Sequence, residues 1–307
     1  MTATGNEAVR LSQLRTATGS TGSGSGSATG GETVTIAQAA QALGATPTGM
    51  QDIGGRAIRL SQLKTAVEVF SSVEIVPWST GTDEQIAAMV AAADAGEIVL
   101  SRYWSAGDTR TVQLSAMPAT EVGGRNAAQS VQFVLTDPGH YTLANGQPCN
   151  FVVLQKDCLN ESGFMNKQNT NEGGWNDCGR RTWCNNTYRN AIPSGLRGIF
   201  KQFKVRTADG SGSTAVESTD WFSLFSEKEI FGSTANANSS AESQNTQLDY
   251  YKTSSNRIKL RNGSAKSWFE RSPCTGFGDR YCSVSSSGVA RCSYANYNYG
   301  IAPFGCI

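Results

Sequence analysis

Cysteine is the residue type in this 307-residue sequence whose number and spacing could support chemistry most directly. Thiolates bind metals, form disulfides and act as nucleophiles. No two of the eight cysteines are separated by two residues, so the spacing of a zinc ribbon or finger is missing. Buried reduced thiols are the preferred interpretation, and a disulfide formed in an oxidising medium is the alternative. The cysteines are Cys149, Cys158, Cys178, Cys184, Cys274, Cys282, Cys292 and Cys306.

One histidine and one tripeptide are the other candidates for catalysis or metal binding. His140 ends the turn-forming sequence Asp137-Pro138-Gly139-His140, so we assign it no catalytic role. Trp175-Asn176-Asp177 is a tripeptide that C-type lectins use to hold calcium, and its oxygens suit that ion. Because it precedes a predicted helix and has no carboxylate cluster nearby, an ordinary helix cap is the preferred interpretation. We predict no metal and no cofactor.

The segment 274–300 has the composition of a binding surface rather than of a core strand. Four of the nine tyrosines of the chain lie in it, interleaved with Ser, Asn, Gly and Arg. Tyrosine combines a large rigid contact area with a hydroxyl, and small polar residues adapt their hydrogen bonds, as in antibody paratopes. A core strand would instead alternate Val, Ile and Leu.

The same segment lacks several residue types altogether. No Trp, Met, Gln, Lys or Glu occurs between 274 and 300, and every residue type present can be encoded by a codon that ends in a pyrimidine. Scrambling the first two bases of Asn-type codons, with the third left unchanged, would produce this bias. An ordinary Tyr- and Ser-rich loop is the alternative.

The elements that must position this segment are short strands, two helices and long loops. Helical spacing predicts one helix over about 177–190, with Trp183 and Tyr188 facing the core, and another after Pro193. Cys178 and Cys184 would then point to different helix faces, which favours core packing over paired redox chemistry. Two helices in a loop-rich, mostly β chain indicate the α+β class. Strands are predicted at 111–114, 130–135, 151–154 and 202–207.

Smaller features complete the expected organisation of the main domain and its connector. Asp209-Gly210-Ser211-Gly212 predicts a hairpin turn, and Arg180-Arg181 predicts a solvated face or a local salt bridge. Thr82-Asp83-Glu84-Gln85 fits a capping box at the start of a connector helix that Gly96 ends. Ile98-Val99-Leu100 predicts a buried strand.

The first part of the chain contains an internal near-repeat. Residues 8–17 return as 57–66, and each copy runs from an apolar-basic-apolar strand into a Ser that can cap a helix. A Gly- and Ser-rich linker lies between the copies, followed by a short helix over 36–43. Units too small to bury an apolar face alone often do so against other subunits. We therefore interpret this region as an oligomeric stalk or attachment segment. The alternative is a recombination or expression scar at the first copy.

These patterns divide the chain into four parts. They are 1–31 with the first copy and the linker, 32–76 for attachment and oligomerisation, 77–96 as the connector helix, and 97–307 as the main domain. Lys and Arg number 26 against 25 for Asp and Glu, which disfavours a nucleic-acid partner. No apolar run approaches the roughly 18 residues of a membrane span, and no secretory signal is recognisable. We expect a soluble protein.

Several motifs of the main domain resemble those of a family of gut-bacterial and prophage proteins, often described only as a domain of unknown function. The resemblance covers about 97–307, including 173–193, although Phe269 stands where a second Trp is common. It implies a fold similar to the C-type-lectin fold shared with formylglycine-generating enzymes. Some members are diversified by retroelements whose reverse transcriptase mutates adenines. The strongest motifs are Trp268-Phe269-Glu270-Arg271-Ser272-Pro273, Tyr281-Cys282-Ser283-Val284-Ser285-Ser286-Ser287-Gly288 and Gly300-Ile301-Ala302-Pro303-Phe304-Gly305-Cys306-Ile307.

This resemblance implies a phage or prophage tail protein that binds a host-cell surface receptor, either protein or glycan, through a diversified face. The near-repeat resembles the front of phage tail proteins, which implies a virion component made in the bacterial cytoplasm. It also implies attachment to other tail or baseplate proteins and a homo-oligomer, with a trimer favoured. The residues expected to contact the ligand are Phe277, Arg280, Tyr281, Ser283, Arg291, Ser293, Tyr294, Tyr297 and Tyr299.

The resemblance to formylglycine-generating enzymes does not imply their activity, because no matching reactive cysteine pair is assignable. We therefore expect a binding protein and not an enzyme. One alternative is a glycan-binding, lectin-like adhesin of fixed specificity. The other is a lectin-fold enzyme.

Overall fold

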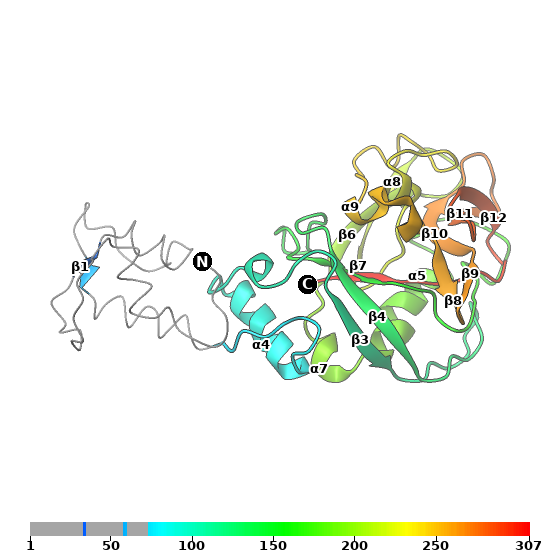
Figure 1. Ribbon diagram of the computed structural model, residues 1–307. Helices are drawn as coiled ribbons and strands as arrows, with labels where there is room; N and C mark the ends of the chain where they lie inside the picture. Colours follow the sequence, from blue (N-terminus) through cyan, green and yellow to red (C-terminus); the bar gives the residue numbers. More distant parts are fainter. Residues whose placement is uncertain (1–32, 35–57, 60–72) are drawn as a thin grey trace. The chain divides into compact units, whose positions relative to one another are not determined.

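The computed structural model describes residues 33–34, 58–59 and 73–307, and these residues form the α+β protein that the sequence predicts. Small, mostly antiparallel sheets alternate with short helices and long loops (Figure 1). One unit comprises the described residues up to Val76 together with Ala88–Tyr103, and a second comprises Pro77–Ala87 with Trp104–Ile307. The repeat copy at 8–17, the linker, the helix at 36–43 and most of 57–66 lie outside the described residues.

In the first unit, β1 (Thr33–Val34) pairs antiparallel with β2 (Ile58–Arg59), where the second repeat copy was predicted to begin as a strand. The strand predicted at 98–100 is wrong. The 3-10 helix η1 (Leu100–Arg102) occupies this place, and it buries Leu100 while Val99 stays 49% exposed. A single apolar side chain is therefore buried by a turn, without a strand.

Helix α4 (Asp83–Asp94) confirms the predicted connector helix. The Thr82 amide donates to Gln85 Oε1 at 2.8 Å, and the Gln85 amide donates to Thr82 Oγ1 at 3.2 Å. This reciprocal pair satisfies amides that the first helical turn leaves free. Gly96, with φ of +76°, follows the helix in the left-handed conformation that glycine adopts without strain.

The largest sheet of the second unit has the antiparallel order β13-β5-β4-β3. Its strands, and the neighbouring hairpin of β6 and β7, confirm all four predicted strands to within two residues, and the predicted turn at 209–212 joins β6 to β7. The bounds are β3 (Thr109–Leu114), β4 (Gln129–Thr136), β5 (Val152–Gln155), β6 (Phe203–Ala208), β7 (Ala215–Asp220) and β13 (Phe304–Cys306).

Aromatic rings fill the core beside the C-terminal strand. Phe304 of β13 stacks on Phe225 with a centroid distance of 4.0 Å. Gly305 follows it, and a Cβ atom there would lie 2.7 Å from Phe200 and 2.8 Å from Phe222. Only glycine lets this strand approach the two rings so closely.

One continuous helical stretch occupies the region predicted to be helical over about 177–190. It consists of α5 (Gly179–Trp183), the π-helix η2 (Cys184–Tyr188) and α6 (Arg189–Ala191), and both Trp183 and Tyr188 are buried as predicted. Cys178 and Cys184 are also buried, which confirms core packing. The helix predicted after Pro193 is the single turn α7 (Ser194–Arg197).

The predicted helix cap at Asn176 or Asp177 is wrong. The cap residue is Cys178, which makes no side-chain cap bond. The amide of Gly179 instead donates to Asn166 Oδ1 at 2.7 Å. A side chain from a separate loop thus satisfies the helix start.

The two arginines of α5 have different environments. Arg181 Nε lies 2.6 Å from Asp220 Oδ1, which confirms a local salt bridge. Arg180 is only 2% exposed, so a solvated face is wrong for this residue. Its guanidinium donates to the carbonyls of Phe164 and Val122 and lies over the Trp183 ring. These acceptors offset the cost of its burial.

The remaining elements are short. None of the helices within the described ranges is long and apolar enough to cross a membrane. They comprise α8 (Glu227–Phe231), α9 (Asp249–Lys252), the 3-10 helix η3 (Ser254–Arg257), the hairpin of β8 (Lys259–Arg261) and β9 (Ser264–Lys266), and the sheet of β10 (Trp268–Pro273), β11 (Arg280–Val284) and β12 (Ala290–Tyr294).

A buried ion pair ties β10 to α8. Arg271 donates through both terminal nitrogens to Glu229, at 2.6 and 2.7 Å, and also to the carbonyl of Leu224 at 2.7 Å. Ser272 accepts from the amide of Glu227 and donates to Glu242. Burial by itself raises the pKa of Glu229, but the charge and hydrogen bonds of Arg271 hold it below its ordinary value.

Glu229→Gln removes the negative charge from this pair and keeps the side-chain shape. We expect the free energy of unfolding to fall by about 3–5 kcal/mol, because Arg271 would remain buried without a counter-charge. Urea unfolding measures this change. The control is Asp249→Asn in the exposed pair with Lys252, which should leave stability unchanged. Equal effects of the two substitutions would contradict the role of the buried pair.

Glu242 provides a pH-dependent test of the same region. Burial raises its pKa from the ordinary 4.5 to about 7, so between these values the folded protein holds a proton that the unfolded chain releases. The free energy of unfolding therefore falls as the pH rises through this window, by about 3 kcal/mol. Glu242→Gln should lose this contribution, so its decrease between about pH 5 and pH 8 in urea unfolding should be smaller, although the buried Glu270, whose pKa is also raised, still contributes. Parallel pH profiles of the two proteins would refute this assignment.

Candidate ligand-binding face

The segment predicted to bind a ligand forms most of a three-stranded antiparallel sheet with the order β10-β11-β12. β10 is buried along its whole length, β11 is buried except at Arg280, and β12 is the edge strand and is partly exposed. Figure 1 shows the three strands, in orange to dark red, grouped apart from the β3–β4 hairpin. Exposure therefore increases from the framework strand towards the edge.

The register of β11 and β12 decides which side chains share a face. Arg280 pairs with Tyr294, and Cys282 pairs with Cys292. Since side chains alternate along a strand, these four lie on one face, and Tyr281, Ser283, Arg291 and Ser293 lie on the other.

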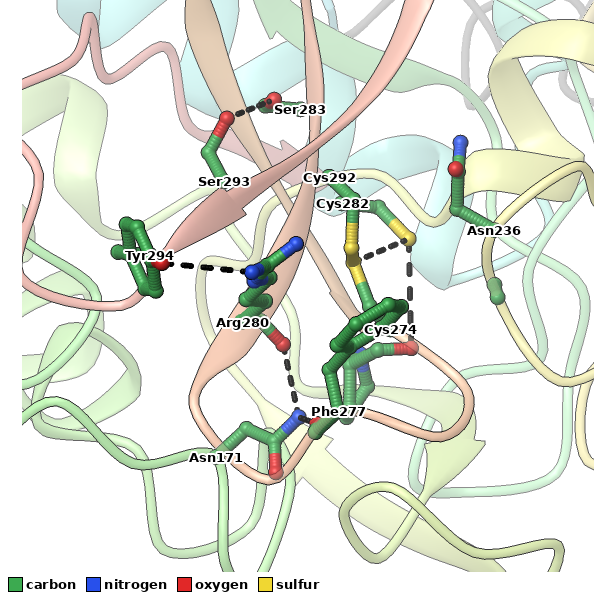
Figure 2. The surroundings of a disulfide bond; sticks show 12 residues. Asn171, Asn236, Cys274, Phe277, Arg280, Cys282, Ser283, Cys292, Ser293 and Tyr294 are labelled. Atoms are coloured by element: carbon green, nitrogen blue, oxygen red, sulfur yellow. Dashed lines mark hydrogen bonds between the residues drawn. A yellow bond between two sulfur atoms is a disulfide. The ribbon is translucent and has the colours of Figure 1, made fainter.

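Arg280 lies between two aromatic rings on the first face. Its guanidinium carbon is 4.3 Å from the Phe277 ring centroid and 4.7 Å from that of Tyr294. It also donates to the Tyr294 hydroxyl at 3.3 Å (Figure 2). Nε lies 3.5 Å from Asp279 Oδ1 as an ion pair without a hydrogen bond. The rings and the carboxylate hold the cation at the surface.

Two further tyrosines extend this arrangement. The Tyr297 ring lies 5.1 Å from that of Tyr294 and 6.0 Å from that of Tyr299, which in turn lies 5.2 Å from Phe269 of β10. We call the continuous surface of Phe277, Arg280, Tyr294, Tyr297 and Tyr299 the aromatic track. Its residues are half-buried or exposed, and Phe277 and Tyr297 are each 45% exposed.

The structure corrects the expectation of ligand contact for three residues. Because they are buried, these side chains are not accessible to a ligand: Tyr281, Ser283 and Ser293. The Tyr281 hydroxyl donates to the carbonyl of Gly174 at 2.8 Å, and burial raises its pKa well above the ordinary value. The hydroxyls of Ser283 and Ser293 lie 2.8 Å apart and bond each other. These side chains join the sheet to the interior.

Arg291 is exposed, but the alternation of β12 points it away from the face that carries Tyr294. The structure thus brings five of the nine expected contact residues together in the aromatic track. It leaves Arg291 accessible apart from them.

Asn171 is a supporting residue that the sequence did not reveal. Its side-chain Nδ2 donates to the carbonyls of Phe277 and Arg280, both at 2.7 Å (Figure 2). Its backbone N–H donates to the carbonyl of Gly278 at 2.9 Å. An asparagine in a polar loop gives no local signal of such a role. Its side chain fixes the loop that presents Phe277.

A recess of about 340 Å³ adjoins this loop. Gly278 lines it together with polar residues of two other loops, Thr170, Asn171, Glu172 and Asp209–Gly212. In the part of the chain that the structure describes, no group of three His, Cys, Asp or Glu side chains could hold a metal ion. The face therefore offers aromatic rings, one cation and polar groups for contact.

A disulfide joins the loop after β10 to the edge strand. Cys274 and Cys292 are bonded with a Cα–Cα distance of 6.2 Å, and the Cys282 sulfur lies 3.8 Å from that of Cys274 (Figure 2). For these two cysteines the alternative prediction of a disulfide holds, and the preferred one of reduced thiols is wrong. The other six cysteines are buried free thiols, as preferred. A loop of this length gains about 3 kcal/mol from its crosslink.

Comparison with known proteins places the chain in one family. It belongs to the family described as "Domain of unknown function (DUF6273)", which matches residues 150–307. The matched segment contains the complete three-stranded sheet and the aromatic track. No curated protein and no solved structure gives a significant match.

The division between buried and accessible tyrosines can be tested directly. Tyr281→Ala should lower the free energy of unfolding by about 3–5 kcal/mol, because it empties a buried ring site and removes the hydrogen bond to Gly174. Tyr297→Ala should change it by less than about 0.5 kcal/mol. Urea unfolding of both variants measures the difference. Comparable losses would place the Tyr297 ring in the core.

Proposed function

We propose that this protein is a receptor-binding protein of a phage or prophage tail, with a retroelement-diversified ligand-binding face. The observation that carries the proposal is the aromatic track, a continuous accessible surface built on a fully buried strand. Surface aromatics and arginine are the side chains that contribute most to binding energy at interfaces. Their support by a buried framework lets the exposed side chains vary without loss of the fold.

The proposed fold is C-type-lectin-like. The small antiparallel sheets, the two helical segments over 179–197 and the long loops support it. A C-terminal strand that returns to pair with β5 inside the main sheet also supports it. In this proposal the loops after β10 and β12 present the variable side chains.

The proposed partners follow from the two ends of the chain. The C-terminal face binds a protein or glycan receptor on the host cell, and the N-terminal region attaches the protein to other tail or baseplate components in the virion. A trimer presents several copies of the face at once. Multiple attachment raises the apparent affinity of a weak single site.

The proposed role is binding and not catalysis. Burial raises the pKa values of Cys158, Cys178 and Cys184, which disfavours their reactive thiolate forms. Cys149 has a lowered pKa through its hydrogen bond with Cys306, but its thiol is buried. These environments support a structural role for the thiols over the enzyme alternative.

Sequencing the encoding locus and its close relatives tests this proposal. A diversified binder requires a nearby partial copy of the last hundred or so bases that differs from the gene only at adenines. The altered codons should include those of the aromatic track. An invariant 3′ end without such a copy or a reverse transcriptase would overturn diversification and favour a lectin-like adhesin of fixed specificity.

The binding role itself predicts the behaviour of a triple variant. Alanine at Tyr294, Tyr297 and Tyr299 should abolish adsorption to host cells, because it removes the rings that supply most of the contact area. The melting temperature should remain nearly unchanged. The control is Tyr103→Ala, since Tyr103 is 45% exposed like Tyr297 but lies outside the track. Full adsorption of the triple variant would exclude the aromatic track as the binding face.

A further inference from the structure

A second recess of the same unit lies outside the 274–300 segment. Its volume is about 350 Å³, which is enough for a sugar-sized ligand. The described residues that line it include three basic side chains and no acidic one, together with apolar and amide groups. The residues that matter here are Asn145, Arg189, Arg197, Lys201, Gln202 and Trp221.

The π-helix η2 sets the geometry of this recess. Asn185 in η2 accepts hydrogen bonds from the amides of Trp221 at 2.6 Å and of Phe222 at 3.3 Å. One turn later, the Arg189 guanidinium carbon lies 4.1 Å from the centroid of the Trp221 ring. Single π turns within α-helices often occur at functional sites. Here the wider turn coincides with a stacked arginine and tryptophan at the edge of the recess.

Among the described residues, neither Arg189 nor Arg197 of this recess pairs with a carboxylate. Within the part of the chain that the structure describes, Arg189 Nε is buried and has no hydrogen-bond acceptor, and Arg197 donates to the backbone and side-chain oxygens of Asn190. Burial, and secondly the charge of Arg197, lower the pKa of Arg189. Buried donors without partners are rare, and like charges held together are unfavourable. An anionic ligand would offset the repulsion between the two guanidinium groups.

We propose that this recess binds a small carboxylated sugar of the uronic-acid class. Arg189 and Arg197 receive the carboxylate, since guanidinium groups match its planar geometry. The uncovered part of the Trp221 ring packs against the C–H groups of the sugar, and the amides of Asn145 and Gln202 bond its hydroxyls. A bare inorganic anion would leave the aromatic and amide lining unused. None of these residues lies in the aromatic track, so the inference does not depend on the proposed diversified face.

Calorimetric titration of the full chain at low salt tests this proposal with three probes: glucuronate, glucose and inorganic phosphate. Glucuronate should bind, glucose should not, and phosphate should bind more weakly than glucuronate. Arg189→Gln should weaken glucuronate binding about tenfold or more, the effect of losing one charge-assisted hydrogen bond. The matched control is Arg125→Gln, because Arg125 is exposed and does not line the recess.

Three outcomes would overturn the proposal. They are no binding of glucuronate, phosphate binding tighter than glucuronate, and equal glucuronate affinity of the Arg189→Gln variant and the unaltered protein. Arg197→Gln gives a second test should Arg189→Gln not fold, since Arg197 is half-buried and its hydrogen bonds go to a single residue, Asn190, at the end of the preceding helical stretch. That variant should also lose about tenfold in affinity, and unchanged binding would count against the site.

Discussion

The buried pair of Arg271 and Glu229 is the interaction on which the sheet that carries the aromatic track depends. Both side chains are almost completely removed from solvent, and two hydrogen bonds of 2.6 and 2.7 Å join them. Such a pair does not add much net stability, because desolvating two charges costs about as much as their attraction returns. It does select one arrangement, since any displacement of β10 would leave a buried charge without its partner. The position of β10 then determines those of β11 and β12, which pair in sequence beside it.

A fixed β10 accounts for the separation between interior and accessible positions in the last thirty or so residues. Along β11 and β12, Tyr281 and Ser293 on one face enter the interior, and Arg280 and Tyr294 on the other face reach the surface. The exceptions are Cys282, which is buried, and Arg291, which is exposed. Asn171 and the disulfide of Cys274 hold the loop between β10 and β11 in place. The aromatic track therefore rests on atoms that its own side chains do not supply. This is the physical requirement for a surface that changes its residues and keeps its shape.

Local patterns in the sequence predicted much of this structure, and non-local contacts account for most errors. Short apolar-rich runs identified β3, β4 and β5 of the main sheet but not β13, and composition identified the segment that carries the track. Composition could not separate Tyr281 from Tyr294, because a strand reverses its exposed side with a register shift of one residue. The cap of α5 was missed because Asn166, which supplies it, lies in another loop. Arg180 was expected in solvent, since only the folded chain brings two carbonyl acceptors to it.

The most direct measurement compares two matched libraries of the full chain for resistance to proteolysis. One library randomises Phe277, Tyr294 and Tyr297 of the track, and the other randomises the buried Tyr281, Ser283 and Ser293. A rigid framework under the accessible aromatic track predicts that most members of the first library stay folded and that few members of the second do. Equal survival, or better survival of the second library, would contradict this account of the sheet.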